Sequence, residues 1–333
     1  MIKIALDVMA GDKGIDANID GALSSLDGSF MVSLVGDQNL IRDKMNQSKN
    51  KFLQSINIVN ANSVISMDAK IAEFRSDRSS SIYQGLSLVK NNNADAFISI
   101  GNSGAIFANS LKVLGRIQGI SRPGFAVPIP SINGMRILLD GGANADSKAE
   151  NYLHFALLGA QYYESVFKKR NPKIGLLSIG SEPSKGSQLT LEAYKILEEN
   201  CPNFIGNIEG TDLTNDVDVD VVVSDGFTGN VALKSMEGIA ELIKANLIQE
   251  SQANLMAKIG LLLLKPSIKK IYKRLDYRQY GAVPLLGVNG LVYVGHGRSD
   301  FNAVENAIHA AVKSVHGNLF SSLEQSIDGT RNN

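Results

Sequence analysis

Short apolar runs that end in glycine or acidic residues constrain the fold of this chain more than any other feature of its sequence. Each run is four to eight residues long and lacks a clean alternation of apolar and polar side chains. That pattern is typical of strands buried on both faces, as in a parallel sheet. The runs cover residues 3–7, 31–36, 96–101, 137–141, 174–180 and 219–226.

Amphipathic helical patterns alternate with these runs. Residues 81–90 place Ile82, Leu86 and Val89 on one helical face, and residues 189–200 and 301–316 are spaced in the same way. Alternating strands and helices predict an α/β fold, a three-layer α/β/α sandwich with a mostly parallel, Rossmann-like central sheet. At about 150 residues per domain the chain has room for two domains or one large one. We predict a single catalytic domain over residues 1–333.

The composition excludes several classes of protein. Lys and Arg together number 33, and so do Asp and Glu, so the chain lacks the net basic charge that favours nucleic-acid binding. Cys201 is the only cysteine, which excludes an intramolecular disulfide and a cysteine-rich zinc site. The four histidines have no dense ligand spacing, so we expect no metal site and no cofactor.

The apolar segments indicate a cytoplasmic protein. Asp7 and Asp12 interrupt the first apolar run too early for a signal peptide. A helix that spans a bilayer needs about 20 apolar residues, and residues 259–264 form a much shorter stretch. We therefore expect no transmembrane helix and a reducing compartment.

Residues 240–280 interrupt the alternation of strands and helices. This stretch reads as helices with no strand between them. From residue 251 to residue 280 it carries seven Lys or Arg residues against a single acidic residue, Asp276. We interpret 240–280 as a helical insertion that projects from the sheet and serves dimer or membrane contact.

Polar loops follow the predicted strands, at the edge where open α/β sheets bind their ligands. Asn102, Ser103 and Gly104 offer an amide, a hydroxyl and backbone N–H groups at a predicted helix start, an arrangement that binds anions. Such residues taken singly are usually helix caps. Several Gly-rich strand ends together with basic side chains favour a phosphate or another oxyanion. The other candidates in these loops are Arg78, Ser80, Ser81, Asn144, Lys185, Asp225, Thr228 and Asn230.

The common nucleotide-binding motifs are absent from the sequence. Nothing matches GxxxxGK[ST], and no GxGxxG follows the first predicted strand, which disfavours ATP, GTP and ordinary NAD sites. His296 stands between two glycines after the apolar run 291–294, so its imidazole is expected at a strand end. A role in the site and a role in turn packing both remain open for it.

These loops, in this order, resemble those of the bacterial phosphate acyltransferases, a family that acts at the start of membrane phospholipid synthesis. The resemblance runs nearly from end to end of the chain, and its last three stretches are long and specific. The matching stretches are 5–12 (ALDVMAGD), 99–105 (SIGNSGA), 139–144 (LDGGAN), 204–210 (FIGNIEG), 223–231 (VSDGFTGNV) and 280–290 (YGAVPLLGVNG).

The resemblance implies transfer of a fatty acyl group from acyl carrier protein (ACP) to inorganic phosphate, which gives acyl phosphate and free carrier. It also implies a fold related to phosphotransacetylases and isocitrate-dehydrogenase-like enzymes. From the resemblance we also expect a homodimer that associates peripherally with the inner face of the membrane. A downstream glycerol-3-phosphate acyltransferase is expected as a partner.

The implied chemistry needs little from the protein beyond positioning and stabilisation of charge. Phosphate is substantially dianionic near neutral pH, with the phosphomonoester second pKa of about 6 as a guide. The thiol that leaves has a pKa of about 8.5, so its thiolate departs readily. What remains is orientation of the reactants and stabilisation of the developing oxyanion.

Roles for the candidate residues follow from this chemistry. Asn102, Ser103 and Gly104 would cradle phosphate, and Asn230 would donate to the thioester oxygen. Lys185 would bind phosphate or neutralise the tetrahedral intermediate. The remaining assignments are phosphate contacts from Arg78, Ser80, Ser81 and Thr228, orientation of Lys185 or Asn230 by Asp225, and shaping of the pocket by Asn144 and His296.

The predicted insertion has an apolar and a basic component. In a membrane anchor its apolar side chains would enter the lipid interface, and its lysines would meet anionic headgroups. The alternatives are dimer packing and a docking site for acidic ACP. The residues assigned to membrane contact are Leu255, Ile259, Leu261, Leu262, Leu263 and Lys265.

Three other functions fit parts of the same pattern. A phosphotransacetylase that uses coenzyme A would share the fold and the site. A metal- and NAD-dependent β-decarboxylating dehydrogenase would share the architecture but need several Asp residues around a metal. A membrane-bound scaffold for lipid-synthesis enzymes would show partner binding without turnover.

Overall fold

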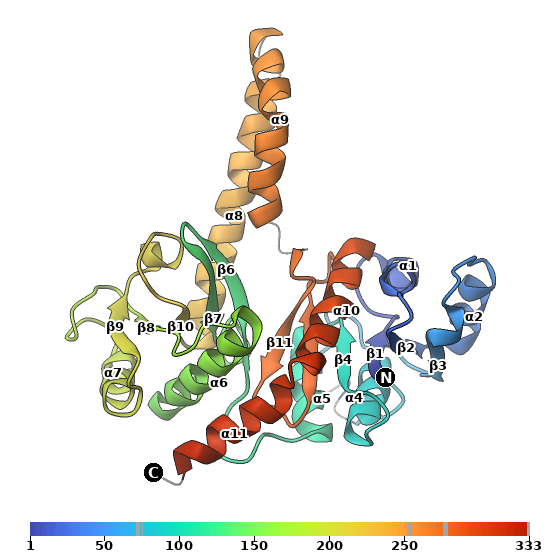
Figure 1. The fold of residues 1–333 in the computed structure, drawn as a ribbon, viewed down its shortest axis with the longest axis horizontal. Helices are drawn as coiled ribbons and strands as arrows, with labels where there is room; N and C mark the ends of the chain where they lie inside the picture. Colours follow the sequence, from blue (N-terminus) through green and yellow to red (C-terminus); the bar gives the residue numbers. More distant parts are fainter. Residues whose placement is uncertain (71–73, 75, 252–254, 276–278, 332–333) are drawn as a thin grey trace.

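The chain folds around two sheets that lie side by side (Figure 1). The computed structural model describes residues 1–70, 74, 76–251, 255–275 and 279–331. The expected α/β architecture is confirmed, whereas the single central sheet of the prediction is divided into a seven-stranded and a five-stranded sheet.

The larger sheet has the strand order β3-β2-β1-β4-β12-β11-β5. Its first five strands are parallel to one another, and β11 is antiparallel to both of its neighbours. The strands are β1 (Ile2–Asp7), β2 (Phe30–Gly36), β3 (Ile56–Asn60), β4 (Ala96–Ser99), β5 (Gly124–Phe125), β11 (Ala282–Leu286) and β12 (Leu291–Gly295).

The smaller sheet has the strand order β6-β7-β10-β8-β9. Only its edge strand β6 is antiparallel. The strands are β6 (Val127–Ser131), β7 (Gly134–Leu139), β8 (Ile174–Leu177), β9 (Phe204–Ile208) and β10 (Val221–Val223). All six predicted apolar runs therefore overlap a strand.

Helices cover both faces of the sheets. Alternate residues of β1 show this: Ile4 and Leu6 join the core beneath α1 and α10, and Ala5 joins the core on the opposite side, beneath α4 and α5. The helices are α1 (Gly14–Ser25), α2 (Gln38–Asn46), α4 (Ser81–Lys90), α5 (Ser103–Val113), α6 (Ala149–Phe167), α7 (Gln188–Asn200), α8 (Gly226–Ser251), α9 (Leu255–Leu275), α10 (Phe301–His316) and α11 (Leu319–Arg331), with short 3-10 turns η1 (Leu53–Ser55) and η2 (Gly210–Leu213).

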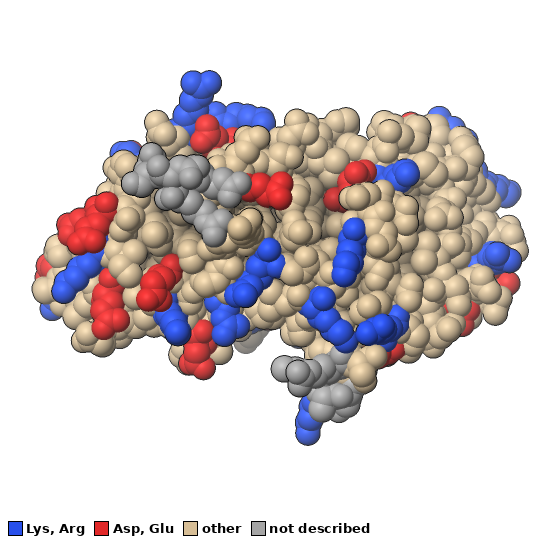
Figure 2. All heavy atoms as spheres, turned by 90° about the horizontal axis from the view of Figure 1, so that it is seen from below, with Lys and Arg blue, Asp and Glu red and all other residues tan. Residues whose placement is uncertain are grey.

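One core joins the two sheets. The cluster that contains Ile4 and Leu6 continues through Ile137 and Val221 of the smaller sheet to Phe155 on α6. Burial of apolar side chains between layers is the main stabilising contribution in such a fold. Figure 2 shows that Lys and Arg side chains lie beside Asp and Glu side chains over the face seen from below, in keeping with the zero net charge.

The helices α8 and α9 form a hairpin that projects from the body of the molecule (Figure 1). The first of them begins at Gly226, well before residue 240, because the helix that follows β10 continues without a break into the projecting part. The hairpin exposes many large apolar side chains, among them Ile243, Met256, Leu262 and Leu263. Among the residues that the structure describes, no helix is both long and apolar enough to cross a membrane.

Candidate active site

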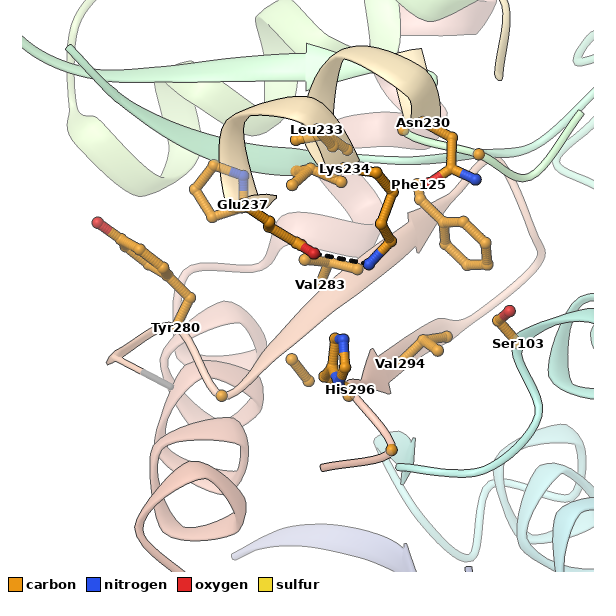
Figure 3. A pocket seen from close by; sticks show the side chains of 18 of the residues that line it. Ser103, Phe125, Asn230, Leu233, Lys234, Glu237, Tyr280, Val283, Val294 and His296 are labelled. Atoms are coloured by element: carbon orange, nitrogen blue, oxygen red, sulfur yellow. Dashed lines mark hydrogen bonds and ion pairs between the residues drawn. The ribbon is translucent and has the colours of Figure 1, made fainter. Parts of the chain in front are cut away.

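A cavity of about 400 Å³ lies in the crevice between the two sheets (Figure 3). The carboxyl ends of β4, β12 and β7 open into it, together with the start of β11 and the first turns of α8. This is the edge at which open α/β sheets bind ligands. Its polar and apolar lining includes Ser103, Phe125, Val127, Gly142, Asn230, Leu233, Lys234, Glu237, Tyr280, Val283 and His296.

The N-terminus of α5 forms one wall of the cavity. Asn102 caps this helix, since its Oδ1 accepts the Ala105 N–H at 3.0 Å. The Asn102 amide nitrogen donates to backbone carbonyls of the segment before α4, including Met67 at 2.9 Å. The Asn102 side chain therefore already forms hydrogen bonds within the protein. The groups that face the cavity are the Ser103 hydroxyl and the backbone at the helix start.

Buried polar groups support this wall from behind. The Ser99 hydroxyl donates to Asp7 at 2.8 Å and accepts the Gly101 N–H at 3.1 Å. Asp7 also accepts the Met9 N–H at 3.1 Å. Burial raises the pKa of Asp7, and these hydrogen bonds oppose that rise. The ends of β1 and β4 are thus linked directly beneath the loop that carries Ser103.

Asp140 organises the loop after β7. Its side chain is fully buried and accepts backbone N–H groups from Phe125, Gly142, Ala143 and Asn144 at 2.7–3.0 Å. It also accepts the Asn144 side-chain amide at 2.9 Å. Burial raises the pKa of Asp140 and the hydrogen bonds oppose that effect. The loop that places Gly142 in the cavity wall is held by this one carboxyl group.

Glycines bring the start of α8 against the same loop. A Cβ on Gly229 would stand 2.1 Å from the Asp140 carbonyl oxygen, and one on Gly226 would stand 2.5 Å from the Asn144 carbonyl oxygen. Only glycine permits this approach. It places Asn230 at the cavity, where a Cβ on Gly142 would lie 3.2 Å from the Asn230 Cβ.

Asp225 caps the start of α8. Its carboxylate accepts the Thr228 N–H at 2.8 Å and the Thr228 hydroxyl at 2.7 Å, and it accepts the Tyr152 hydroxyl at 3.2 Å. The predicted orientation of Lys185 or Asn230 by Asp225 is not seen. Its carboxylate instead contacts the helix start and α6, and Thr228 belongs to the same cap.

His296 lies at the end of β12, in the wall opposite α8 (Figure 3). Its Nδ1 accepts the Arg298 N–H at 3.2 Å. Burial lowers the pKa of His296, and the positive charge of Lys234 lowers it further. The imidazole therefore favours its neutral form.

Lys234 and Glu237 were not among the predicted site residues. Both lie on α8 and both line the cavity, and Lys234 Nζ donates to Glu237 Oε2 at 2.7 Å (Figure 3). Their spacing from Asn230 could have indicated them, because they follow it by four and seven residues and so share its face of the helix. In the sequence alone they look like part of an ordinary solvated helix face.

Several predicted residues do not reach the cavity. Ser80 is fully buried as the cap of α4 and accepts the Tyr83 N–H at 3.3 Å, and Ser81 is buried as well. Asn144 is buried and donates to the Pro123 carbonyl at 2.6 Å. Arg78 is exposed on the loop before α4 and is absent from the cavity wall.

Lys185 also lies outside the cavity. It is on the loop after β8, and β10 separates β8 from β7 in the smaller sheet. The Lys185 carbonyl accepts the Ser178 hydroxyl at 3.0 Å, which fixes the loop locally. Within one chain, the structure does not bring Lys185 to Asn230.

Comparison with known proteins identifies the family. A family model described as "Fatty acid synthesis protein" matches residues 2–322. A curated protein from Halothermothrix orenii, named phosphate acyltransferase, is 42% identical over 98% of this chain and 99% of its own length. The chain belongs to the phosphate acyltransferase family. A second phosphate acyltransferase, from Thermodesulfovibrio yellowstonii, is 40% identical over 99% of this chain and 95% of its own length.

Solved structures show the fold that this phosphate acyltransferase shares with other proteins. A phosphotransacetylase from Streptococcus pyogenes matches 95% of this chain and 94% of its own, with a TM-score of 0.61 and 18% identity. A branched-chain phosphotransacylase from Enterococcus faecalis matches 95% and 99% of the two chains, with a TM-score of 0.55 and 13% identity. The expected relation to the phosphotransacetylase fold is confirmed.

Proposed function

We propose that this phosphate acyltransferase moves a fatty acyl group from ACP to inorganic phosphate and releases acyl phosphate for phospholipid synthesis. The observation that carries the proposal is the composition of the cavity. Phe125, Val127 and Leu233 offer apolar surface for an acyl chain. Ser103, Asn230 and the start of α5 offer hydrogen-bond donors for a phosphate and a carbonyl oxygen.

The reaction would proceed by direct attack. A phosphate oxygen forms a bond to the thioester carbonyl carbon, the carbonyl oxygen takes the negative charge, and the carrier thiolate leaves as the C–S bond breaks. Phosphate is already nucleophilic as a dianion, so no serine or cysteine nucleophile is needed. The protein supplies orientation and stabilisation of the oxyanion.

Four residues retain roles at the cavity in this proposal. Ser103 and the N–H groups of the first turn of α5, including that of Gly104, hold the phosphate at the positive end of the helix dipole. Asn230 donates its amide to the thioester oxygen. His296, in the opposite wall, shapes the space between them.

The predicted residues that lie outside the cavity act indirectly. Asn144 and Asp225 hold the backbone on which the cavity wall is built. Ser80 and Ser81 start α4, the helix packed next to α5. The role of Lys185 requires contact with a second subunit or with the carrier, since it lies outside the cavity of its own chain.

We also propose that the hairpin serves assembly and membrane contact on the cytoplasmic face of the membrane. Side chains along α8, such as Ile239 and Leu242, are more than half exposed in one chain, which favours a homodimer that covers them. On α9, Leu262 and Leu263 are 66% and 75% exposed. Lysines 244, 258 and 265 surround an apolar groove between α8 and α9, a combination that favours anionic lipid surfaces.

The residues predicted to contact the membrane differ in how far their side chains are exposed. Ile259 is 45% exposed, Leu261 is half-buried, and Lys265 lines the groove. Leu255 begins α9, and its side chain lies outside the described residues. A downstream glycerol-3-phosphate acyltransferase would take up the acyl phosphate near the same surface.

A coenzyme A donor is the second candidate function. The observation that favours it is the phosphotransacetylase fold, with a TM-score of 0.61 to the Streptococcus pyogenes enzyme. The two donors carry the same thioester and differ only in the carrier. The site chemistry described above applies to both.

A mass-spectrometric assay for acyl phosphate tests the proposal. Purified protein is incubated with palmitoyl-ACP and inorganic phosphate in the presence of EDTA, with palmitoyl-coenzyme A in a parallel reaction. Acyl phosphate from palmitoyl-ACP supports the proposal. Product from palmitoyl-coenzyme A alone supports the second candidate, and absence of product from both donors contradicts acyl transfer to phosphate.

A further inference from the structure

We propose that Lys234 is the cation that binds the substrate phosphate and that Glu237 is its resting counter-ion, which the phosphate displaces. The inference rests on the proposed function and specifies how that function recognises its anionic substrate. It concerns two residues that the resemblance to the family did not single out.

The position of Lys234 carries the inference. It follows Asn230 by four residues on α8, so both side chains project from the same face of the helix into the cavity. Figure 3 shows the Lys234 amine extended from α8 toward the space above His296, with Ser103 on the far side of that space. An anion in this space would meet the amine, the Ser103 hydroxyl and the Asn230 amide.

The charge balance of the cavity points to the same residue. Inorganic phosphate carries between one and two negative charges near neutral pH. A helix N-terminus supplies only about half a positive charge. Among the described residues that line the cavity, Lys234 is the only lysine or arginine. The neutral form of His296, favoured by its lowered pKa, leaves Lys234 as the source of full positive charge.

Glu237 fits the role of a displaceable partner. The pair is close, at 2.7 Å, but the two side chains are 57% and 43% exposed. Ion pairs at such exposure are weak because water screens them. A doubly charged phosphate that also receives bonds from α5 and Asn230 competes well for the same amine. Before phosphate binds, Glu237 holds the Lys234 amine close to the position at which it would contact the phosphate.

The two residues therefore have opposite effects on phosphate binding. Lys234→Met removes the cation while retaining the length of the side chain. Glu237→Gln removes the competing charge and a source of repulsion for the dianion while retaining the shape of the side chain. Lys195→Met, at an exposed position on α7 away from the cavity, is the matched control for loss of a lysine.

The experiment measures KM for phosphate and kcat with palmitoyl-ACP for each variant, and phosphate affinity by equilibrium dialysis with labelled inorganic phosphate. We expect Lys234→Met to raise KM for phosphate about tenfold or more. We expect Glu237→Gln to lower it about two- to fivefold. Lys195→Met should match the wild type, and KM for palmitoyl-ACP should change less than KM for phosphate in both cavity variants.

The outcomes separate the inference from the function on which it rests. If the wild type makes acyl phosphate and Lys234→Met keeps a normal KM for phosphate, the inference is wrong and the function stands. A rise of KM in Glu237→Gln would likewise contradict the counter-ion role. If the wild type makes no acyl phosphate, the function fails, and dialysis still decides whether Lys234 binds the anion.

Discussion

Asp140 Oδ2 accepts both N–H groups of Asn144, the backbone amide at 2.7 Å and the side-chain amide at 2.9 Å. Oδ1 of the same carboxyl group accepts the Phe125, Gly142 and Ala143 N–H groups. One buried side chain thus joins the end of β7, the strand β5 and the cavity wall. Its importance for the enzyme is indirect, because it holds the backbone that brings Gly142 against Asn230.

Replacement of Asp140 should destabilise the protein and disturb the cavity. Asp140→Ala leaves several buried N–H donors without an acceptor, and each such loss costs about 1–3 kcal/mol. We expect the free energy of unfolding to fall by at least about 3 kcal/mol in urea titrations. Asp146→Ala, an exposed residue on the same loop, is the control and should be neutral. Equal stability of the two variants would contradict the role given to Asp140.

Two glycines of α8 should respond in opposite directions to the same substitution. In Gly229→Ala the new Cβ would lie 2.1 Å from the Asp140 carbonyl oxygen, so α8 must move, at a cost of about 1–3 kcal/mol. Gly238→Ala meets no atom within 4 Å and gains helix propensity, which stabilises by about 0.5–1 kcal/mol. Thermal unfolding of the two variants measures both effects. A stabilising Gly229→Ala would show that α8 is not tightly seated on the Asp140 loop.

Asn230 and Lys185 can be separated kinetically. Asn230→Ala should lower kcat about 100-fold, or about 3 kcal/mol in the barrier, as for the loss of an oxyanion donor. Lys185→Ala is expected to lower it less, since Lys185 does not line the cavity of its own chain. An equally large loss would mean that Lys185 acts through a second subunit or through the carrier. If it acts in the cavity of a second subunit, mixed dimers of the two variants would regain activity, which subunit-mixing assays detect.

The stability of the protein should depend on His154 in mildly acidic solution. Burial lowers the pKa of His154 below its ordinary value of 6.5, and its Nδ1 lies 2.9 Å from the Ser121 hydroxyl. Below pH 6.5 the unfolded chain therefore binds a proton that the folded chain does not. The free energy of unfolding falls as the pH is lowered through this window, by up to about 1.4 kcal/mol per pH unit.

Urea titrations between about pH 7.5 and pH 5.5 test this dependence. His154→Gln should flatten the change of stability with pH relative to the wild type. His316→Gln, at the exposed end of α10, serves as the control and should retain it. The same slope in the wild type and in His154→Gln would exclude His154 as its origin.

Membrane contact by the hairpin can be tested with vesicles. Leu262→Glu places a charge on a side chain of α9 that is 66% exposed. Sedimentation with phosphatidylglycerol vesicles should fall about tenfold or more, since a buried leucine contributes about 1.5–3 kcal/mol and the new carboxylate repels the lipid. Leu40→Glu, on the exposed surface of α2, should bind as the wild type does. Unchanged sedimentation of Leu262→Glu would argue against insertion.

Much of the fold could be predicted from the sequence because strand burial and helix periodicity are local signals. The predicted helices 81–90 and 301–316 have the observed bounds of α4 and α10. The division into two sheets could not be predicted in the same way. It depends on β6, which pairs with the neighbouring strand β7, and on β11, which pairs across a long stretch of sequence with the two-residue strand β5.

The site shows the corresponding limit of sequence reasoning. Ser103, Asn230 and His296 could be predicted because each follows an apolar strand that ends at the sheet edge where the cavity lies. Ser80, Asn144 and Asp225 stand at similar places, yet the same polar groups cap helices and tie loops. The sequence does not distinguish a polar group that serves the backbone from one that is left for a ligand.

The helix α8 fixes the angular relation between the cavity and the free end of the hairpin. It runs unbroken through 26 residues, which corresponds to a rod of about 39 Å. Each residue turns an α-helix by about 100°, so one inserted residue beyond Glu237 would swing every later side chain a quarter-turn or more around the rod. The number of residues in α8 therefore constrains the orientation of the hairpin relative to the cavity. It sets the direction in which the hairpin's apolar surface faces when Asn230 faces the substrate.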